Sequence, residues 1–242
     1  MKIESWDDRR DYIIPGDAKQ TIDFAAEHWI HSYERSVQQR GRFAVALSGG
    51  STPKAIYEIL GKEKLDGSKI WLFWSDERAV PPSHPDSNYK MAMESGLANL
   101  NIPPSQIFRM VAEKDIEKNA LDYEEKIRHY LGKTLFDLVM LGVGEDGHTA
   151  SLFPESAALQ EETRLVMPNY ISEKKCWRMT LTYPCINQSF HTVIYAIGKS
   201  KHLIIPQILN AAIVSKYPAS SIGNSINKCL YILDNSASSL LK

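Results

Sequence analysis

Short apolar runs alternate along this chain with segments in which apolar residues recur every three or four positions. Residues 17–40 show the second pattern, which predicts a long helix with one buried face. The run Phe43–Leu47 is continuously apolar, and a second helical pattern follows it from about Ala55. A continuous apolar run is typical of a strand buried on both faces of a parallel sheet. The beginning of the chain therefore predicts a strand, a turn and a helix.

The same alternation continues to the end of the chain. Further strands are expected at Ile70–Trp74, Phe136–Leu141, Arg164–Met167, Arg178–Thr182, Thr192–Ile197 and Leu230–Leu233, and further helices from about Ser87, over Ile116–Leu131 and from Lys201 to about Val214. This order predicts an α/β fold of the Rossmann type, a doubly wound and mainly parallel sheet with helices on both faces. Ligands of such sheets bind beyond the carboxyl ends of the strands, so the loops after Leu47, Trp74, Leu141 and Ile197 are the places to seek chemistry.

Composition narrows the class of protein. The 242 residues contain no Pro/Gly-rich linker or internal repeat, so we expect a single domain over residues 1–242. With 28 Lys+Arg against 29 Asp+Glu, the chain has no broad basic surface, which argues against a nucleic-acid partner. No apolar run approaches the roughly 20 residues that cross a bilayer, and the charged start lacks the pattern of a signal peptide. The 3 Cys show no C-x-x-C spacing, which favours free thiols in the cytoplasm.

The loop after Leu47 reads Ser-Gly-Gly-Ser-Thr-Pro-Lys and joins a strand to a helix. Paired glycines let the backbone approach a ligand, and we expect Thr52 to cap the helix with Pro53 at its first position. Free N–H groups at a helix N-terminus attract phosphate, although the spacing of a Walker A loop is absent. A capped turn without a ligand is the alternative. The predicted phosphate contacts are Gly49, Gly50, Ser51 and Thr52.

The loop after Trp74 places charged side chains where a buried strand ends. Asp76 can act as a base or orient another group, and Arg78 can hold a phosphate or carboxylate through two hydrogen bonds. An ordinary solvated charge cluster is the alternative. Ser87 follows at the expected N-terminus of the next helix and is its predicted cap.

The loop after Leu141 contains a literal G-x-G-x-x-G pattern. A dinucleotide-binding site is rejected because Pro154 interrupts the expected crossover helix and no acidic residue follows the next predicted strand. Asp146 and His148 favour a different chemistry, since a carboxylate beside an imidazole fixes its tautomer and lets it act as a general base toward water. The alternative is a tight turn in which His148 caps a helix.

Two further cations follow strands at the same predicted edge. Lys201 opens the helix after Ile197, and Arg178 begins a strand that ends near this edge, so both are candidates to bind an anion. A solvent-exposed lysine is the alternative for Lys201. We expect no metal, because H-E-x-x-H and Cys/His clusters are absent and the pair His28 and His31 is more typical of an exposed helix face.

Taken together in this order and spacing, these motifs resemble the 6-phosphogluconolactonase family, which shares its fold with glucosamine-6-phosphate isomerase/deaminase. The resemblance covers nearly the whole chain. Its landmarks are Ser48–Lys54, Asp76–Arg78, His84–Tyr89, Gly142–Pro154, Arg178–Thr182, Asn187 and the pair Gly198 and Lys201. Two departures separate the chain from the deaminases. Arg78 stands where they usually have Tyr, and Ser151–Pro154 stands where they carry a Phe-Asn-Glu-Pro-like segment with a catalytic glutamate.

The resemblance implies a sugar-phosphate isomerase-like fold and hydrolysis of 6-phospho-D-glucono-1,5-lactone to 6-phosphogluconate, in the oxidative pentose phosphate pathway. His148 would activate water, Asp146 would orient it, and the phosphate would lie on residues 49–52 with Asp76, Arg78, Arg178 and Lys201 around the substrate. We expect no cofactor, no membrane or nucleic-acid partner, and a monomer or weak homo-oligomer. A glucosamine-6-phosphate deaminase and a non-catalytic sugar-phosphate-binding protein stay open as alternatives.

Overall fold

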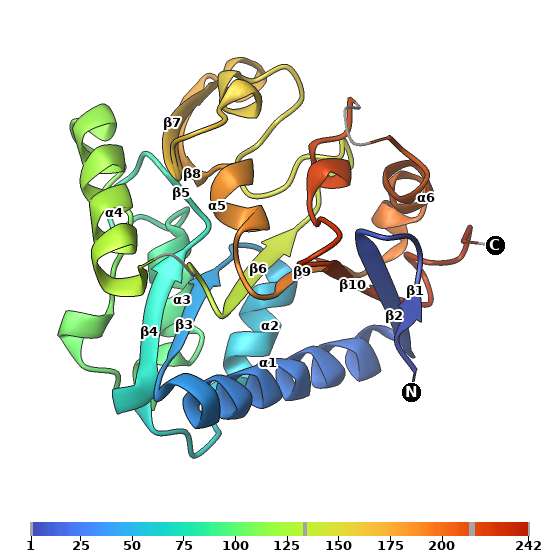
Figure 1. Ribbon diagram of the computed structural model, residues 1–242, viewed down its shortest axis with the longest axis horizontal. Helices are drawn as coiled ribbons and strands as arrows, with labels where there is room; N and C mark the ends of the chain where they lie inside the picture. Colours follow the sequence, from blue (N-terminus) through green and yellow to red (C-terminus); the bar gives the residue numbers. More distant parts are fainter. Residues whose placement is uncertain (1, 133–134, 213–215, 242) are drawn as a thin grey trace.

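The computed structural model describes residues 2–132, 135–212 and 216–241. Its main feature is a seven-stranded sheet in the order β1-β2-β10-β9-β6-β3-β4, accompanied by a three-stranded sheet in the order β5-β8-β7. In the main sheet only the β1–β2 pair is antiparallel among the described residues. The α/β class and the mainly parallel sheet predicted from the sequence are confirmed (Figure 1).

The strands are β1 (Glu4–Ser5), β2 (Arg10–Gly16), β3 (Phe43–Leu47), β4 (Ile70–Trp74), β5 (Asp76–Arg78), β6 (Leu138–Gly142), β7 (Val166–Ile171), β8 (Cys176–Leu181), β9 (Thr192–Ala196) and β10 (Cys229–Asp234). The helices are α1 (Ala18–Arg40), α2 (Ser51–Leu60), α3 (Asn88–Glu94), α4 (Ile116–Leu131), α5 (Tyr183–Asn187) and α6 (Ile204–Leu209).

The register of the central strands brings their carboxyl ends to one edge. Leu47 of β3 lies opposite Trp74 of β4, and Gly142 of β6 lies opposite Tyr195 of β9. Since β9, β6, β3 and β4 are consecutive in the sheet, the loops that follow them are neighbours. The small sheet lies beyond the upper end of β4 in Figure 1, while α1 crosses the opposite end.

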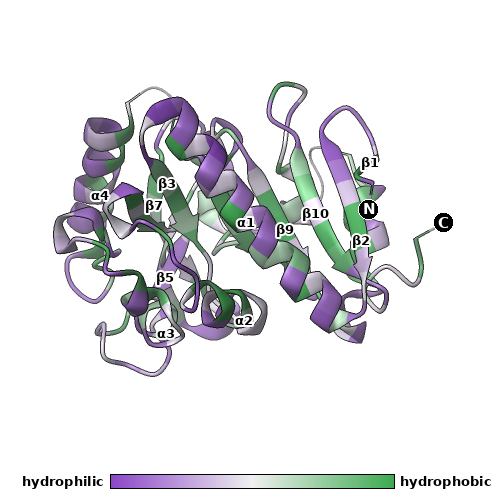
Figure 2. Cartoon of the chain, turned by 90° about the horizontal axis from the view of Figure 1, so that it is seen from below, coloured by the Kyte–Doolittle hydropathy of each residue, from purple (hydrophilic) through white to green (hydrophobic). Residues whose placement is uncertain are grey.

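Helix α1 covers the sheet with a buried face on which Ala25, Ala26, Trp29 and Tyr33 are joined by small polar residues. Asp17 caps it by accepting a hydrogen bond from the Gln20 N–H at 2.9 Å, and Gly41 ends it with a φ of +73°. Its buried Trp29 packs edge-to-face on Phe43 of β3 with ring centroids 4.9 Å apart. Figure 2 shows hydrophilic and hydrophobic segments alternating along this helix, which lies over the sheet.

The small sheet was not predicted. The strands expected near Arg164 and Arg178 are β7 and β8, which pair antiparallel with each other instead of joining the main sheet. The reason is the short connection between them, a 3-10 turn at Ser172–Lys174, because parallel neighbours need a long crossover. Strand β7 also continues through Pro168, which an edge strand tolerates.

Several local predictions are wrong, including Pro53 as the first residue of its helix. Helix α2 begins at Ser51 with Gly50 as its N-cap and no side-chain cap, so Thr52 does not cap it. The positive φ of Gly50, +107°, makes the turn instead. Lys201 lies in a 3-10 turn, Lys199–Lys201, and the following helix α6 is much shorter than expected. The expected end of that helix near Val214 falls outside the described residues, and strands β1 and β2 had not been predicted.

Candidate active site

The loop after β6 holds an imidazole and a carboxylate in contact. The Gly147 N–H donates to the Gly144 carbonyl at 3.1 Å and the Gly144 N–H to the His148 carbonyl at 2.9 Å, which closes a tight turn. Asp146 Oδ1 accepts from the His148 backbone N–H at 3.1 Å and lies 2.6 Å from His148 Nδ1. The carboxylate therefore holds the proton on Nδ1 and leaves Nε2 as the basic nitrogen.

Two neighbours fix the imidazole plane. The ring of His148 stacks on Phe153 with centroids 4.0 Å apart and an interplanar angle of 16°. On another side lies Gly144, where a Cβ atom would stand 2.1 Å from His148 Nδ1 and 2.4 Å from Asp146 Oδ1. A side chain at position 144 is thus incompatible with the observed pair.

The electrostatics of this pair suit a general base. Burial lowers the pKa of His148 below its ordinary value of 6.5, and the charge of Asp146 opposes part of that shift by raising it. Burial raises the pKa of Asp146, but hydrogen bonds and charge from His148 bring its net shift downward. At neutral pH the site consequently holds a neutral imidazole beside an ionised carboxylate.

Asp76 joins several elements at the same edge. Its buried carboxylate accepts from Asn88 Nδ2 at 3.0 Å and from Ser151 Oγ at 2.6 Å. Arg178 Nη1 lies 3.8 Å from its Oδ2. One carboxylate therefore links β5 to α3, to the loop that carries His148, and to β8.

Glu77 is buried as well and orders the start of α3. It accepts hydrogen bonds from the backbone N–H groups of Arg78, Asn88 and Tyr89 at 2.8 to 2.9 Å and from Ser87 Oγ at 3.0 Å. The cluster after β4 is therefore not a solvated one. Ser87 caps α3 as predicted, accepting from the Lys90 N–H at 3.2 Å.

Two arginines lie opposite each other in the small sheet. Arg78 of β5 stands directly opposite Arg178 of β8, and the Nε atom of each is buried without a hydrogen-bond partner among the described residues. Like charges in direct register are destabilising unless an anion lies between or above them. They line a cavity of about 510 Å³ together with Lys175 and Trp177.

The loop after β3 approaches this cluster through its glycines. A Cβ on Gly49 would stand 1.9 Å from Asn88 Oδ1, so the backbone passes Asn88 at a distance that only glycine allows. In the described part of the chain, the N–H groups of Ser51 and Thr52 at the start of α2 have no acceptor. They are free to bind an anion.

Lys201 lies at the same edge without a contact to the His148 pair. It follows β9, the neighbour of β6, and its partly exposed side chain forms no ion pair with any residue that the structure describes. The structure thus joins Asp146, His148, Asp76 and Arg178 through direct or charge contacts, and brings Lys201 near by topology alone.

Sequence reasoning missed three residues that complete the site. Asn88, Ser151 and Phe153 touch Asp76 or His148. All three lie within motifs that carried the family resemblance, so their position in those motifs was the available signal. No group of three His, Cys, Asp or Glu residues suited to a metal occurs in the ranges described above, and none of the described helices is long and apolar enough to span a membrane.

A parallel sheet with an imidazole–carboxylate pair at its carboxyl edge and two arginines in the adjoining small sheet is typical of an α/β enzyme that acts on a small anionic substrate. Comparison with known proteins makes this specific. The model of the family described as glucosamine-6-phosphate isomerases/6-phosphogluconolactonase matches residues 16–231, and the chain belongs to this family. The resemblance noted in the sequence is confirmed.

Individual relatives agree with this assignment. A 6-phosphogluconolactonase of Chlamydia pneumoniae is 43% identical over 217 residues, which cover 88% of this chain and 83% of that protein. One of Nostoc sp. is 36% identical over 211 residues, covering 84% and 87%. The solved structure of 6-phosphogluconolactonase from Trypanosoma cruzi superposes with a TM-score of 0.86 at 30% identity and covers 96% of each chain.

Proposed function

We propose that this chain hydrolyses 6-phospho-D-glucono-1,5-lactone to 6-phosphogluconate, with His148 as the general base. The observation that carries the proposal is the 2.6 Å contact between His148 Nδ1 and Asp146 Oδ1, in a loop between the phosphate-binding candidates. The activity itself is the one named for the relatives, which match most of the chain in sequence or, for the Trypanosoma cruzi protein, in structure.

The reaction needs two proton transfers. His148 Nε2 takes a proton from water while the water oxygen bonds to the lactone carbonyl carbon. The tetrahedral intermediate then collapses, the bond to the ring oxygen breaks, and the imidazolium returns its proton to that oxygen. Asp146 stabilises the charged imidazole between the two steps, and general-base help of this kind contributes on the order of 10²–10⁴ in rate.

The phosphate has a natural place on the cationic side of the site. Arg78 and Arg178 present guanidinium groups with buried, unpartnered Nε atoms, and the N–H groups of Ser51 and Thr52 are free. Together with Gly49, Gly50 and Lys201 they form the proposed phosphate-binding group. Asp76 was predicted to contact the substrate; its contacts favour a positioning part, since it holds Ser151 and faces Arg178.

We further propose that the enzyme forms one domain over residues 1–242 and acts in the cytoplasm. It uses no cofactor or metal and is a monomer or a weak homo-oligomer. The three free cysteines, of which Cys185 and Cys229 are buried, support a reducing compartment.

The test measures the rate of hydrolysis of freshly generated lactone and compares it with the spontaneous rate. The native chain should accelerate the phosphorylated lactone strongly and the unphosphorylated lactone far less. The variant His148→Ala should lower kcat by about 10²–10⁴. His129→Ala, on the exposed side of α4, is the matched control and should keep native kcat.

Near-native kcat in His148→Ala would show that His148 is not the general base. Release of ammonia from glucosamine 6-phosphate by the native chain would establish the deaminase instead. Binding of phosphosugars without any acceleration would establish a non-catalytic binding protein.

A further inference from the structure

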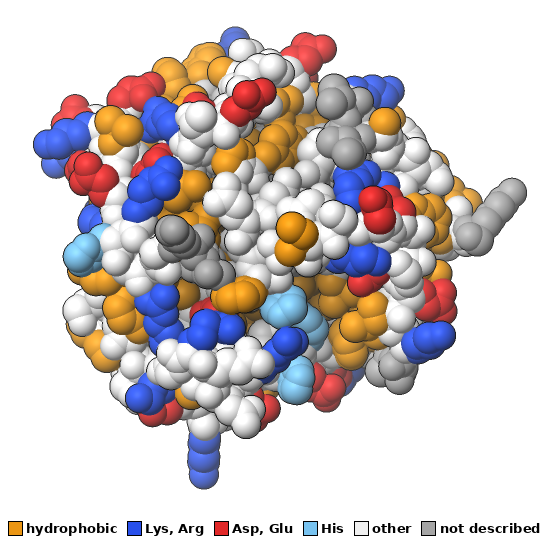
Figure 3. Space-filling view, in the orientation of Figure 1, with side chains coloured by type: hydrophobic (Ala, Val, Ile, Leu, Met, Phe, Trp, Pro, Cys, Tyr) orange, Lys and Arg blue, Asp and Glu red, His pale blue; other side chains and the backbone are white. Residues whose placement is uncertain are grey.

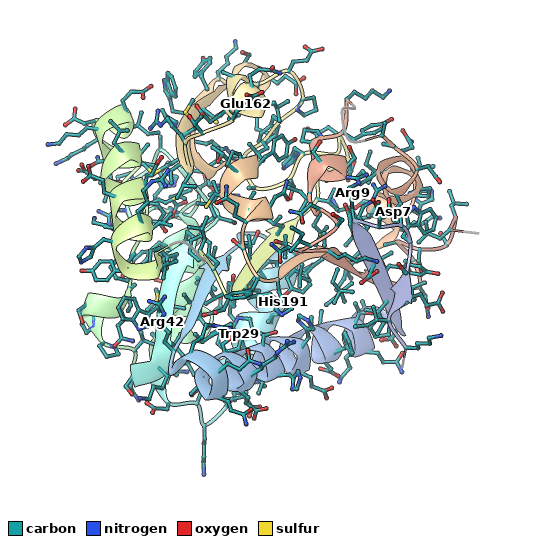
Figure 4. The ribbon with its side chains drawn as sticks, viewed as in Figure 1. Asp7, Arg9, Trp29, Arg42, Glu162 and His191 are labelled. Carbon is teal, nitrogen blue, oxygen red and sulfur yellow. The ribbon has the colours of Figure 1, made fainter. Side chains whose placement is uncertain are left out.

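A second cavity lies at the other edge of the main sheet. It encloses about 460 Å³ between α1 and the residues that precede β9 and β10. Its volume is in the range of sites for small molecules. His191 stands directly before β9, and Figure 4 shows it above α1. Because the proposed catalytic loop follows the far end of the neighbouring strand β6, the two sites are separated by the length of these strands, roughly 16 Å.

Basic side chains dominate the lining of this cavity. His28, His31 and Arg35 recur at three- and four-residue spacing, so they share one face of α1. His191 faces them from the loop before β9. Figure 3 shows histidine side chains gathered with lysine and arginine side chains on this face of the molecule.

The other charged groups of the lining are already paired. Lys228 Nζ lies 3.0 Å from Asp11 Oδ1, and Arg40 Nε lies 2.7 Å from Asp137 Oδ1. Asp11 is the only acidic residue that lines the cavity among the described residues. Arg35 lies on the exposed rim of the cavity and has no hydrogen bond or ion pair within the described ranges, so its guanidinium is available to an anion.

One of these histidines lacks a hydrogen-bond partner within the described part of the chain. His28 Nδ1 is buried and has no hydrogen-bond partner in the described structure. Burial lowers the pKa of His28 to about 4, and the nearby His191 and His31 contribute. Burial likewise lowers the pKa of His191, with Arg35 and Arg40 adding to the shift and Asp137 opposing it. The described lining thus offers the charge of Arg35 and one buried imidazole nitrogen, His28 Nδ1, that no described residue hydrogen-bonds.

We propose that this cavity is a second binding site, which takes a small phosphate-bearing anion between Arg35 and the histidines of α1 and His191. Phosphate oxygens are acceptors only, and they match a guanidinium fork and imidazole N–H donors. A metal ion fits less well, because no three His, Cys, Asp or Glu side chains of the described residues converge as ligands.

Inorganic phosphate is the probe that tests the site in the full-length chain. The ring resonances of His28 and His191 are followed by NMR during the titration, after assignment with single His→Gln variants, while His148 reports the active site separately. We expect saturable shifts of His28 and His191. Loss of one charged hydrogen-bonding partner in Arg35→Gln should raise the Kd for these shifts roughly tenfold or more.

Lys118→Gln is the control, since it removes a positive charge from α4 instead, and its Kd should match that of the native chain. The proposal is overturned if phosphate moves only the His148 resonance. It is equally overturned if Arg35→Gln and the native chain bind with the same Kd. Neither outcome depends on lactone hydrolysis, so the two proposals fail independently.

Discussion

At the scale of single residues, the proposed catalytic pair Asp146 and His148 depends on the absence of a side chain at position 144. Gly144 faces the His148 ring so closely that a Cβ would stand 2.1 Å from Nδ1. A Cβ added to Gly142, two residues earlier, would have no atom within 4 Å. Of these two glycines, only Gly144 is therefore required by the geometry of the Asp146–His148 pair.

Gly144→Ala should accordingly displace His148 and lower kcat at least tenfold, because a shift of about 1 Å at a catalytic group costs up to 10²-fold. Steady-state lactone hydrolysis measures the effect, with a thermal melt to show that the variant is folded. Gly142→Ala is the matched control and should retain native kcat. Equal activity of the two variants would contradict the observed packing.

The sequence identified Asp146 and His148 by their spacing in a loop after a strand, and their contact is observed. It could not identify Phe153 or Ser151 as partners. Stacking and side-chain hydrogen bonds depend on how a loop folds back, and no local pattern encodes that. Thr52 shows the opposite kind of error: its residue type is common at helix N-caps, but Gly50 is the N-cap of α2.

At the scale of elements, the short helix α3 is held by side chains at its N-terminus. Ser87 accepts from the Lys90 N–H and donates to the buried Glu77, which also accepts from the first helical N–H groups. This junction positions Asn88, which contacts Asp76 in turn. The cap therefore supports the site as well as the helix.

Ser87→Ala should lower the free energy of unfolding by about 1–2 kcal/mol, because the cap and the Glu77 hydrogen bond are lost together. Urea titration of the folded chain gives this value. Ser83→Ala, at an exposed position in the preceding turn, should change it by less than about 0.5 kcal/mol. A Ser87 variant as stable as the Ser83 variant would show that the cap contributes nothing.

The order of elements was largely predictable because β3, β4, β6, β9 and β10 are continuous apolar runs. Strand β2 was not found, because its residues alternate irregularly between buried and partly exposed positions. The pairing of β5, β7 and β8 was not predictable either. Strand pairing depends on the tertiary contacts between these short segments, and not on the composition of any one of them.

At the scale of the whole molecule, burial of His28, a residue of α1 near the loop before β9, makes the free energy of unfolding depend on pH. The pKa of His28 is lowered to about 4 in the folded state, against an ordinary value of 6.5. Between these values the unfolded chain binds a proton that the folded chain does not. Acidification consequently favours unfolding, and this contribution to stability is present above pH 6.5 and lost toward pH 4.

Between pH 7 and pH 5 the native chain should therefore lose about 2 kcal/mol more stability than His28→Gln, measured by urea titration in phosphate-free buffer. His129→Gln, on the exposed side of α4, should behave like the native chain. Parallel pH dependences for the native chain and His28→Gln would show that His28 is not buried in its neutral form.

We propose that neutral His148, held by Asp146, activates water at the carboxyl edge of the sheet. The pH dependence of kcat/KM for lactone hydrolysis tests it most directly. Since burial keeps the pKa of His148 below 6.5, kcat/KM should be constant above that pH and fall about tenfold per unit below the pKa. The residual rate of His148→Ala should lack this fall. A kcat/KM that stays constant into the acid range, or the same fall in His148→Ala, would contradict the account.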